Sequence, residues 1–162
     1  SIYKLVYENG YQIKCKLIGD GVEKPKYQHL VNSLGLDNNI TFESFLTQSK
    51  LIDEIDSSDV VVIPSKVTDL EFEAGPLSLI ESMSRKKICV VSDSVGFASY
   101  MNKKNSVMFK SNDQESLYEK IYYVLNLDKE KRKEIENLAY ELSTNFKFSK
   151  ISKKTEDFLF NS

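Results

Sequence analysis

The stretch Asp59-Val60-Val61-Val62-Ile63-Pro64 is a nearly continuous run of β-branched residues that ends at a proline. Such a run predicts a strand that is buried on both faces, as in a parallel sheet, because a strand with one wet face would alternate apolar and polar residues. Pro64 ends the strand, since it has no N–H for a sheet hydrogen bond. The run 88–92, Ile-Cys-Val-Val-Ser, has the same character and predicts a second strand of this kind.

Around these two runs, strand patterns alternate with helical patterns. The spacing of apolar residues predicts strands at 11–18, 40–42, 59–64, 88–92 and 107–109, and helices at 25–34, 48–55, 76–86, 113–125, 129–142 and 148–160. Residues 1–8 fit either a strand or the last turns of a helix. This alternation predicts an α/β fold: a doubly wound, Rossmann-like parallel sheet with helices on both faces, whose ligands bind beyond the carboxyl ends of the strands.

The composition suits one soluble domain spanning residues 1–162, with 41% hydrophobic residues and a net charge of −2. Because 22 basic and 24 acidic residues nearly balance, no nucleic-acid partner is expected. Cys15 and Cys89 lie in apolar runs, which predicts two buried free thiols and a cytoplasmic protein. No run approaches the ~18 apolar residues of a membrane span. One histidine, His29, and two separated cysteines give no zinc-ligand spacing.

A second stretch, residues 73–81 (Glu-Ala-Gly-Pro-Leu-Ser-Leu-Ile-Glu), predicts a loop that enters a helix. Gly75 permits an unusual backbone angle, and Pro76 suits the first helical turn. The N–H groups of Leu77 and Ser78 would then point outward at the positive end of the helix dipole, which favours a phosphate. Carboxylates beside an anion site are compatible with a phosphate ligand that also carries sugar hydroxyls.

Three polar segments follow strand ends: the turn at Gly19-Asp20-Gly21, the pair at 64–65, and the loop that leads into residues 73–81. In a parallel sheet, segments that follow strand ends gather at the edge where ligands bind. A turn needs glycines without any ligand, so a structural role for Gly19 and Gly21 stays open. Acids near a helix start also complement its dipole without binding anything, so the same alternative stays open for Glu73 and Glu81.

Taken together, these segments resemble the C-terminal, donor-binding domain of retaining glycosyltransferases of family 4, within the GT-B superfold. The most specific part of the resemblance is the pair Glu73 and Glu81, seven residues apart, between a strand ending in Pro-Ser and a strand ending in Ser-Asp. The resemblance covers nearly the whole chain. It implies a nucleotide diphosphate sugar as donor, a glycan or lipid-linked acceptor, retention of configuration, and no metal or other cofactor.

The resemblance also implies a role for each site residue. Glu73 would be the catalytic-centre residue that orients the sugar, and Glu81 would accept hydrogen bonds from the ribose hydroxyls. The diphosphate would lie at the backbone of Leu77 and Ser78, and the loop at 44–46 would border the base. The donor-binding residues expected on this basis are Gly19, Gly21, Ser44, Phe45, Glu73, Gly75, Pro76, Leu77, Ser78 and Glu81. Lys66 is added to them because it follows a strand end, where its charge would be available to the phosphates.

The chain departs from the family pattern in several places. Ala74, Pro76 and Ser44 stand where glycine is frequent, and the acidic segment 66–72 is longer than usual. The family's first strand, its Arg and Lys that neutralise the diphosphate, and its acceptor-binding N-terminal domain have no counterpart. We therefore expect a fragment of a longer two-domain enzyme that is inactive in transfer by itself, with residues 2–7 as a candidate substitute strand. The resemblance is compatible with peripheral association of the full-length enzyme with the inner face of a membrane.

Several alternatives remain open from the sequence. His29 sits in mid-helix and fits a surface or packing role, Arg85 fits the C-terminal dipole of its helix, and the tyrosines at 118, 122 and 123 fit helix packing. Another GT-B enzyme, such as a nucleotide-sugar epimerase, would use a similar nucleotide site. A non-catalytic, Rossmann-like module for protein partners is the alternative from a different class.

Overall fold

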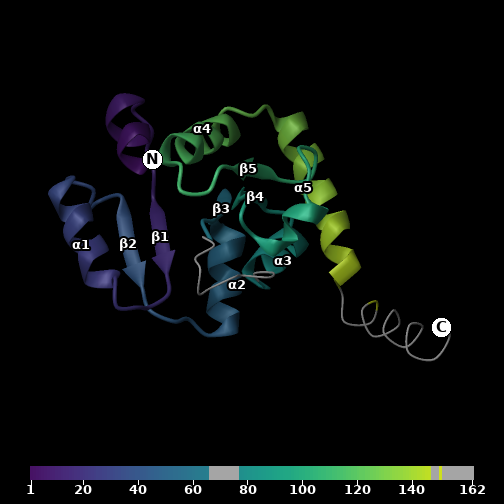
Figure 1. Cartoon of the computed structure of the whole chain (residues 1–162), viewed down its shortest axis with the longest axis horizontal. Helices are drawn as coiled ribbons and strands as arrows, with labels where there is room; N and C mark the ends of the chain where they lie inside the picture. The colour runs from purple at the N-terminus through teal and green to yellow at the C-terminus, as the bar shows by residue number, and fades with distance from the viewer. Residues whose placement is uncertain (66–76, 147–149, 151–162) are drawn as a thin grey trace. The chain divides into compact units, whose positions relative to one another are not determined.

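The computed structural model describes residues 1–65, 77–146 and 150, and it divides the chain into two compact units, Ser1–Glu54 and Ile55–Ser162 (Figure 1). Both units are built from parallel strands flanked by helices, which confirms the predicted fold class. The helix expected at 148–160 lies outside the described residues, apart from Lys150.

The first unit contains a two-stranded parallel sheet. Its elements are the π-helical segment η1 (Lys4–Glu8), β1 (Cys15–Ile18), α1 (Lys24–Ser33), β2 (Ile40–Glu43) and most of α2 (Gln48–Ser57). β1 pairs with β2 from Cys15 opposite Ile40 to Ile18 opposite Glu43. Lys16 on β1 forms an ion pair with Glu54 on α2 at 2.5 Å, which ties this helix to the sheet.

Two expectations for this unit are corrected. Residues 2–8 are helical, so the substitute strand at residues 2–7 is wrong. The strand predicted at 11–18 covers only Cys15–Ile18. Its partner β2 starts at Ile40, opposite Cys15, so the residues before Cys15 have no strand residues opposite them. Before β1 the contacts come from side chains instead: Lys14 Nζ donates to the Asn38 carbonyl at 2.7 Å, and Asn39 Nδ2 donates to the Ile13 carbonyl at 3.0 Å.

α1 ends at Ser33, within one residue of the end predicted from the sequence. Gly35 follows the C-cap residue Leu34 and has a φ of +66°, a left-handed conformation that favours glycine at this position. Its carbonyl accepts a hydrogen bond from Tyr7 Oη at 2.6 Å, so η1 is fastened to the turn that closes α1.

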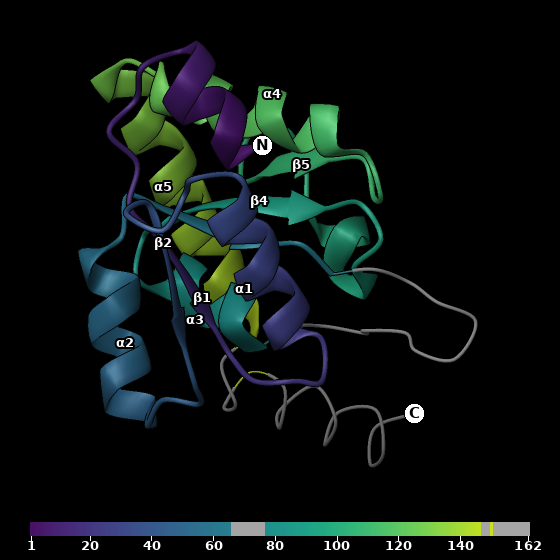
Figure 2. The same ribbon diagram turned by 90° about the vertical axis from the view of Figure 1, so that its left-hand side faces the viewer.

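The second unit contains a three-stranded parallel sheet of order β3-β4-β5. Its elements are β3 (Val60–Ile63), α3 (Leu77–Ser84), β4 (Ile88–Ser92), η2 (Gly96–Tyr100), β5 (Val107–Phe109), α4 (Gln114–Leu125), α5 (Lys129–Ser143) and η3 (Thr144–Phe146). α3 and α5 lie against one another and against β4, and α4 lies against β4 and β5 (Figure 2).

The core of this unit forms around β4, all five residues of which are buried. Successive side chains of a strand point to opposite faces, so burial of the whole strand means that both faces are covered. On the face carrying Cys89 and Val91, the core contains Leu79 and Met83 from α3 and Ala139 from α5. The two-sided burial predicted for 88–92 is therefore confirmed.

The two-sided burial predicted for 59–64 is only partly correct. Val60, Val61 and Val62 are half-buried, and only Ile63 is fully buried. The reason is topological: in the described sheet β3 pairs with β4 alone, so one of its edges has no neighbouring strand.

Helix ends in this unit are held by specific groups. Asp113 and Asp128 accept hydrogen bonds from backbone N–H groups of α4 and α5. α3 ends in a Schellman motif in which Lys86 has a φ of +57° and the N–H of Lys87 reaches the carbonyl of Ser82 at 3.0 Å.

The next segment, 85–87, also secures the carboxyl end of α2. Lys87 Nζ donates to the carbonyls of Asp56 and Ser58 at 2.7 and 3.0 Å. Arg85 forms a two-pronged ion pair with the Asp56 carboxylate, which lowers the pKa of that carboxyl. Arg85 directly follows α3, as its expected dipole role requires, and in addition contacts another helix.

The core around α3 gives a stability prediction. We expect Met83→Ala to lower the free energy of unfolding by about 2–5 kcal/mol, because Met83 is fully buried and the substitution leaves a cavity. Leu77→Ala in the same helix is the control, since 79% of Leu77 is exposed. Urea unfolding followed by circular dichroism measures both, and equal losses for the two variants would contradict this account of the core.

The two cysteines are free thiols with different surroundings. Burial raises the pKa of the Cys89 thiol from 9.0 to about 12, and burial also raises the pKa of the half-buried Cys15. Expected burial is therefore confirmed for Cys89 and partial for Cys15.

This difference predicts selective alkylation. With iodoacetamide at about pH 8, the folded protein should be modified at Cys15 before Cys89, and both should react in urea. Because the folded pKa of Cys89 lies above the unfolded one, its contribution to stability is lost as pH rises from 9.0 towards about 12. Cys89→Ala should therefore show a shallower fall in unfolding free energy over that range. Rapid alkylation of Cys89 in the folded protein would contradict the prediction.

Candidate functional site

In the second unit, polar groups gather where β3 and β4 end. Ser94 Oγ donates to the carbonyl of Ser65, just beyond β3, at 2.8 Å. The same hydroxyl lies 2.8 Å from Ser92 Oγ at the end of β4, and Ser92 is fully buried. These contacts hold the chain leaving β3 against the chain leaving β4.

The end of β5 joins the same edge through Asp93. The N–H of Asp93 donates to the Phe109 carbonyl at 2.9 Å, and Asp93 Oδ1 accepts from the N–H of Ser111 at 2.8 Å. The Ser-Asp end of β4, singled out in the sequence, therefore has a structural function: it fixes the carboxyl edge of the three-stranded sheet.

α3 supplies the predicted ligand groups of this unit. Leu77 begins the helix and is largely exposed, while Ser78 and Glu81 are half-buried. The first N–H groups of an α-helix have no partner among its own carbonyls. Glu81 lies four residues after Leu77, a rise of about 6 Å along the helix. The same short helix thus carries backbone N–H donors at its start and the Glu81 carboxylate about one turn further along.

Four predicted site residues cannot be placed. Lys66, Glu73, Gly75 and Pro76 lie outside the described residues, so their roles stay predictions.

In the first unit, two of the predicted segments meet at the carboxyl end of the sheet. The N–H of Gly19 donates to the Glu43 carbonyl at 3.0 Å, next to Ser44 and Phe45. Gly19 has a φ of +138°, whereas Gly21 has no positive φ, so only one of the two glycines uses the left-handed region. Phe45 is 81% exposed.

Lys24 joins this corner and was missed by the sequence reasoning. Its Nζ donates to Ser44 Oγ at 3.1 Å and lies 3.7 Å from Asp20 Oδ1, while only 20% of its side chain is exposed. Asp20 Oδ1 also accepts from the N–H of Gly21 at 3.0 Å. The spacing of an acid and a lysine four residues apart was a visible signal, but the bond to Ser44 joins two separate loops.

Other residues considered in the sequence lie at the surface. His29 is exposed on α1, in agreement with a surface role. Tyr122 and Tyr123 are 40% and 46% exposed, and the rings of Tyr118 and Tyr122 lie 6.0 Å apart. The packing role expected for this group is therefore only partial.

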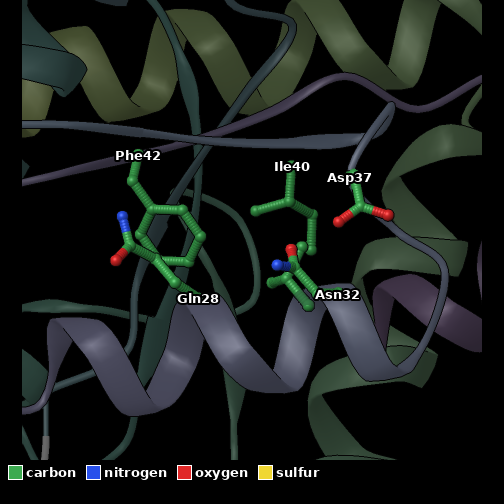
Figure 3. A pocket seen from close by; sticks show the side chains of 6 residues that line it. Gln28, Asn32, Asp37, Ile40 and Phe42 are labelled. Carbon is green, nitrogen blue, oxygen red and sulfur yellow. The ribbon is translucent and has the colours of Figure 1, made fainter.

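A shallow pocket of about 310 Å³ lies in the first unit between α1 and β2 (Figure 3). It is lined by Gln28, Val31, Asn32, Asp37, Ile40 and Phe42. The Asn32 amide nitrogen, in the orientation that satisfies it, donates to the Asp37 carboxylate and to the Gln28 carbonyl. None of the predicted site residues that the structure describes lines this pocket.

Within the described parts of the chain, no three His, Cys, Asp or Glu side chains are grouped as metal ligands. Among the helices at 1–65 and 77–146, none has the length and apolar character needed to cross a membrane.

The fold is similar to that of solved glycosyltransferases, one of which is the C-terminal domain of a group 1 protein. The family model "Glycosyl transferases group 1" matches residues 1–142, and the chain therefore belongs to that family. No curated protein matches the sequence.

Solved structures agree in fold. A glycosyltransferase from Rickettsia africae is 23% identical, with a TM-score of 0.80 over 99% of this chain and 44% of its own. Anabaena HepE, crystallised with UDP-glucose, is 19% identical, with a TM-score of 0.77 over 93% and 42%. The C-terminal domain of LpcC, a group 1 protein from Francisella tularensis, is 21% identical, with a TM-score of 0.73 over 90% and 76%. The chain thus spans less than half of the Rickettsia protein.

The serine contacts at the sheet edge give a stability prediction. We expect Ser94→Ala to lower the unfolding free energy by about 1 kcal/mol, because it removes the hydrogen bond to the Ser65 carbonyl. Ser99→Ala, at an exposed position of η2, is the matched control. Chemical unfolding measures both, and an unchanged midpoint for Ser94→Ala would show that this contact does not hold the edge together.

Proposed function

We propose that this chain is the C-terminal, donor-binding domain of a retaining glycosyltransferase of family 4. In this proposal the whole enzyme moves a hexose from a nucleotide diphosphate sugar to a polysaccharide or glycolipid acceptor. Membership of the group 1 family and the likeness to glycosyltransferase C-terminal domains support the class of enzyme. The neighbours crystallised with UDP or UDP-glucose support the class of donor.

One observation carries the proposal in this chain. α3 packs against β4 and ends four residues before β4 begins, so its start faces the end of that strand, and it carries Glu81 about one turn from its start. Parallel sheets bind ligands at the edge where their strands end, and a helix start binds phosphate through its N–H groups and its dipole. A carboxylate one turn further accepts hydrogen bonds from hydroxyl groups. Diphosphate and ribose of one donor match these two features.

The proposed roles follow this order along α3. The N–H groups of Leu77 and Ser78, preceded by Gly75 and Pro76, hold the diphosphate, and Glu81 accepts from the ribose hydroxyls. Glu73 orients the sugar, and Lys66 is the local cation offered to the phosphates. In the first unit, Gly19, Gly21, Ser44 and Phe45 are assigned to the donor by the family resemblance, with 44–45 bordering the base.

The mechanism proposed for the whole enzyme is front-face transfer with retention. The departing diphosphate gains negative charge as the glycosidic bond breaks, and N–H donors fixed at a helix start stabilise that charge without rearranging. The proposed chemistry needs no metal ion. The acceptor, a glycan or lipid-linked molecule, is supplied by a domain outside this chain, so the chain alone is expected to be inactive in transfer. We place the enzyme in the cytoplasm, at the inner face of the membrane when its acceptor is a lipid.

Calorimetric titration of the chain with UDP and GDP tests the proposal. Binding of either nucleotide supports a donor domain. A folded chain that binds neither would instead support the alternative of a non-catalytic module for protein partners.

The ribose role of Glu81 gives a prediction of its own. We expect Glu81→Gln to weaken nucleotide diphosphate binding by about ten-fold, because hydrogen bonds to a charged acceptor contribute roughly 1.5–3 kcal/mol. Glu119→Gln, at an exposed position of α4, is the control. Unchanged affinity in Glu81→Gln, measured by the same titration, would remove the ribose role.

A further inference from the structure

The corner of the first unit formed by Asp20, Lys24 and Ser44 is a built cluster of polar side chains. Lys24 is the first residue of α1, and its largely buried side chain reaches Ser44 in the loop after β2. Asp20, in the turn after β1, is bonded to the N–H of Gly21. Three side chains from two loops and a helix start are thereby fixed in relation to one another.

We propose that Lys24 and Asp20 read the base of the nucleotide and select a base with a lactam edge, as in uracil or guanine. The inference rests on the proposed function and deepens it, because it names the class of nucleotide. It concerns the first unit alone, where the loop 44–45 is the segment assigned to the base.

The charge balance of the corner favours a neutral ligand group over a phosphate. The Lys24 ammonium is 3.7 Å from the Asp20 carboxylate, so the pair has almost no net charge. A phosphate that approached the ammonium would also meet the carboxylate, and the repulsion would cancel much of the attraction. A neutral group with one donor and one acceptor can satisfy both partners without this penalty.

The donor and acceptor pattern distinguishes among bases. An ammonium can only donate hydrogen bonds, and an ionised carboxylate can only accept them. A lactam edge presents a carbonyl oxygen next to an N–H, so the carbonyl would accept from Lys24 and the N–H would donate to Asp20. Adenine and cytosine present an amino group next to a bare ring nitrogen. In the orientation in which a lactam edge binds, this edge would place its amino donor before the Lys24 ammonium and its bare ring nitrogen before the Asp20 carboxylate, so neither hydrogen bond would form.

Lys24 and Asp20 each have hydrogen-bonding sites beyond those used in the contacts described above. Lys24 has three N–H donors, and one hydrogen bond, to Ser44 Oγ, is formed within the described parts of the chain. Asp20 accepts the Gly21 N–H through Oδ1 and retains further acceptor sites on its carboxylate. Phe45, the residue after Ser44, is 81% exposed and offers an aromatic surface suited to stacking on a flat base.

Matched nucleotides test the proposal on the 162-residue chain. UDP and CDP differ in their lactam and amino edges, and IDP and ADP differ in the same way among purines. We expect the lactam member of one pair to bind about ten-fold more tightly than its amino partner. The pair that shows the preference identifies a pyrimidine or a purine donor. Equal binding within both pairs, or preference for CDP or ADP, overturns the proposal.

Substitutions assign the preference to the corner. Lys24→Met should reduce the preference for the lactam base to about two-fold or less, and Asp20→Asn should reduce it in the same direction, since an amide can both donate and accept. Lys26→Met is the control, because Lys26 is 72% exposed and pairs with Glu23. A circular dichroism melt of each variant checks folding. Because the readout is a ratio of two affinities, general weakening of the site does not alter it.

The outcomes separate this inference from the proposed function. If the folded chain binds no nucleotide, both are overturned. If the chain binds UDP or GDP but Lys24→Met keeps the full preference, Lys24 has no role in selecting the base and the donor-binding function stands. Loss of the preference in Lys24→Met, with the Lys26→Met control unchanged, supports the inference.

Discussion

β4 can hold its place only while side chains cover both of its faces, since all five of its residues are withdrawn from water. This requirement governs the second unit. α3 and α5 must bring Leu79, Met83 and Ala139 against the Cys89 and Val91 face, and the short strands β3 and β5 must pair on either side. The position of α3, which carries the candidate donor groups, is therefore set by the apolar face at its back.

The same strand also explains why polar chemistry gathers at one edge. β4 is apolar up to Ser92, whose buried hydroxyl contacts Ser94. Ser94 is bonded to the segment that leaves β3, and Asp93 is bonded to the segment that leaves β5. A rigid edge of this kind suits ligand binding, because the groups that meet the ligand need little reordering. In the first unit, the contacts among Asp20, Lys24 and Ser44 give the corresponding edge of β1 and β2 a similar order.

The local pattern of apolar and polar residues predicted the helices and strands well, but it predicted the contacts between them poorly. β4, β5, α4 and α5 lie close to their expected bounds, because continuous apolar runs and helical spacing are local properties. β1 is shorter than predicted because strand length depends on the partner's register, and Val60 to Val62 are half-buried because burial depends on the number of neighbouring strands. The pairings of Lys24 with Ser44 and Arg85 with Asp56 join residues far apart in sequence, which no periodicity reveals.

Every strand pair in the described sheets is parallel, and this arrangement has a consequence for how the chain acquires its structure. Val60 pairs with Ile88, and Val90 pairs with Val107. Each of these strand pairs can therefore form only after the chain between its two strands has crossed over. No two-residue hairpin can start the sheet, and non-local pairing of this kind slows folding. During synthesis the apolar run of β3 emerges well before β4, the one strand that pairs with it in the part of the sheet that the structure describes. For that interval the β3 segment has no partner strand to pair with, and transiently exposed apolar segments of this kind are prone to aggregate.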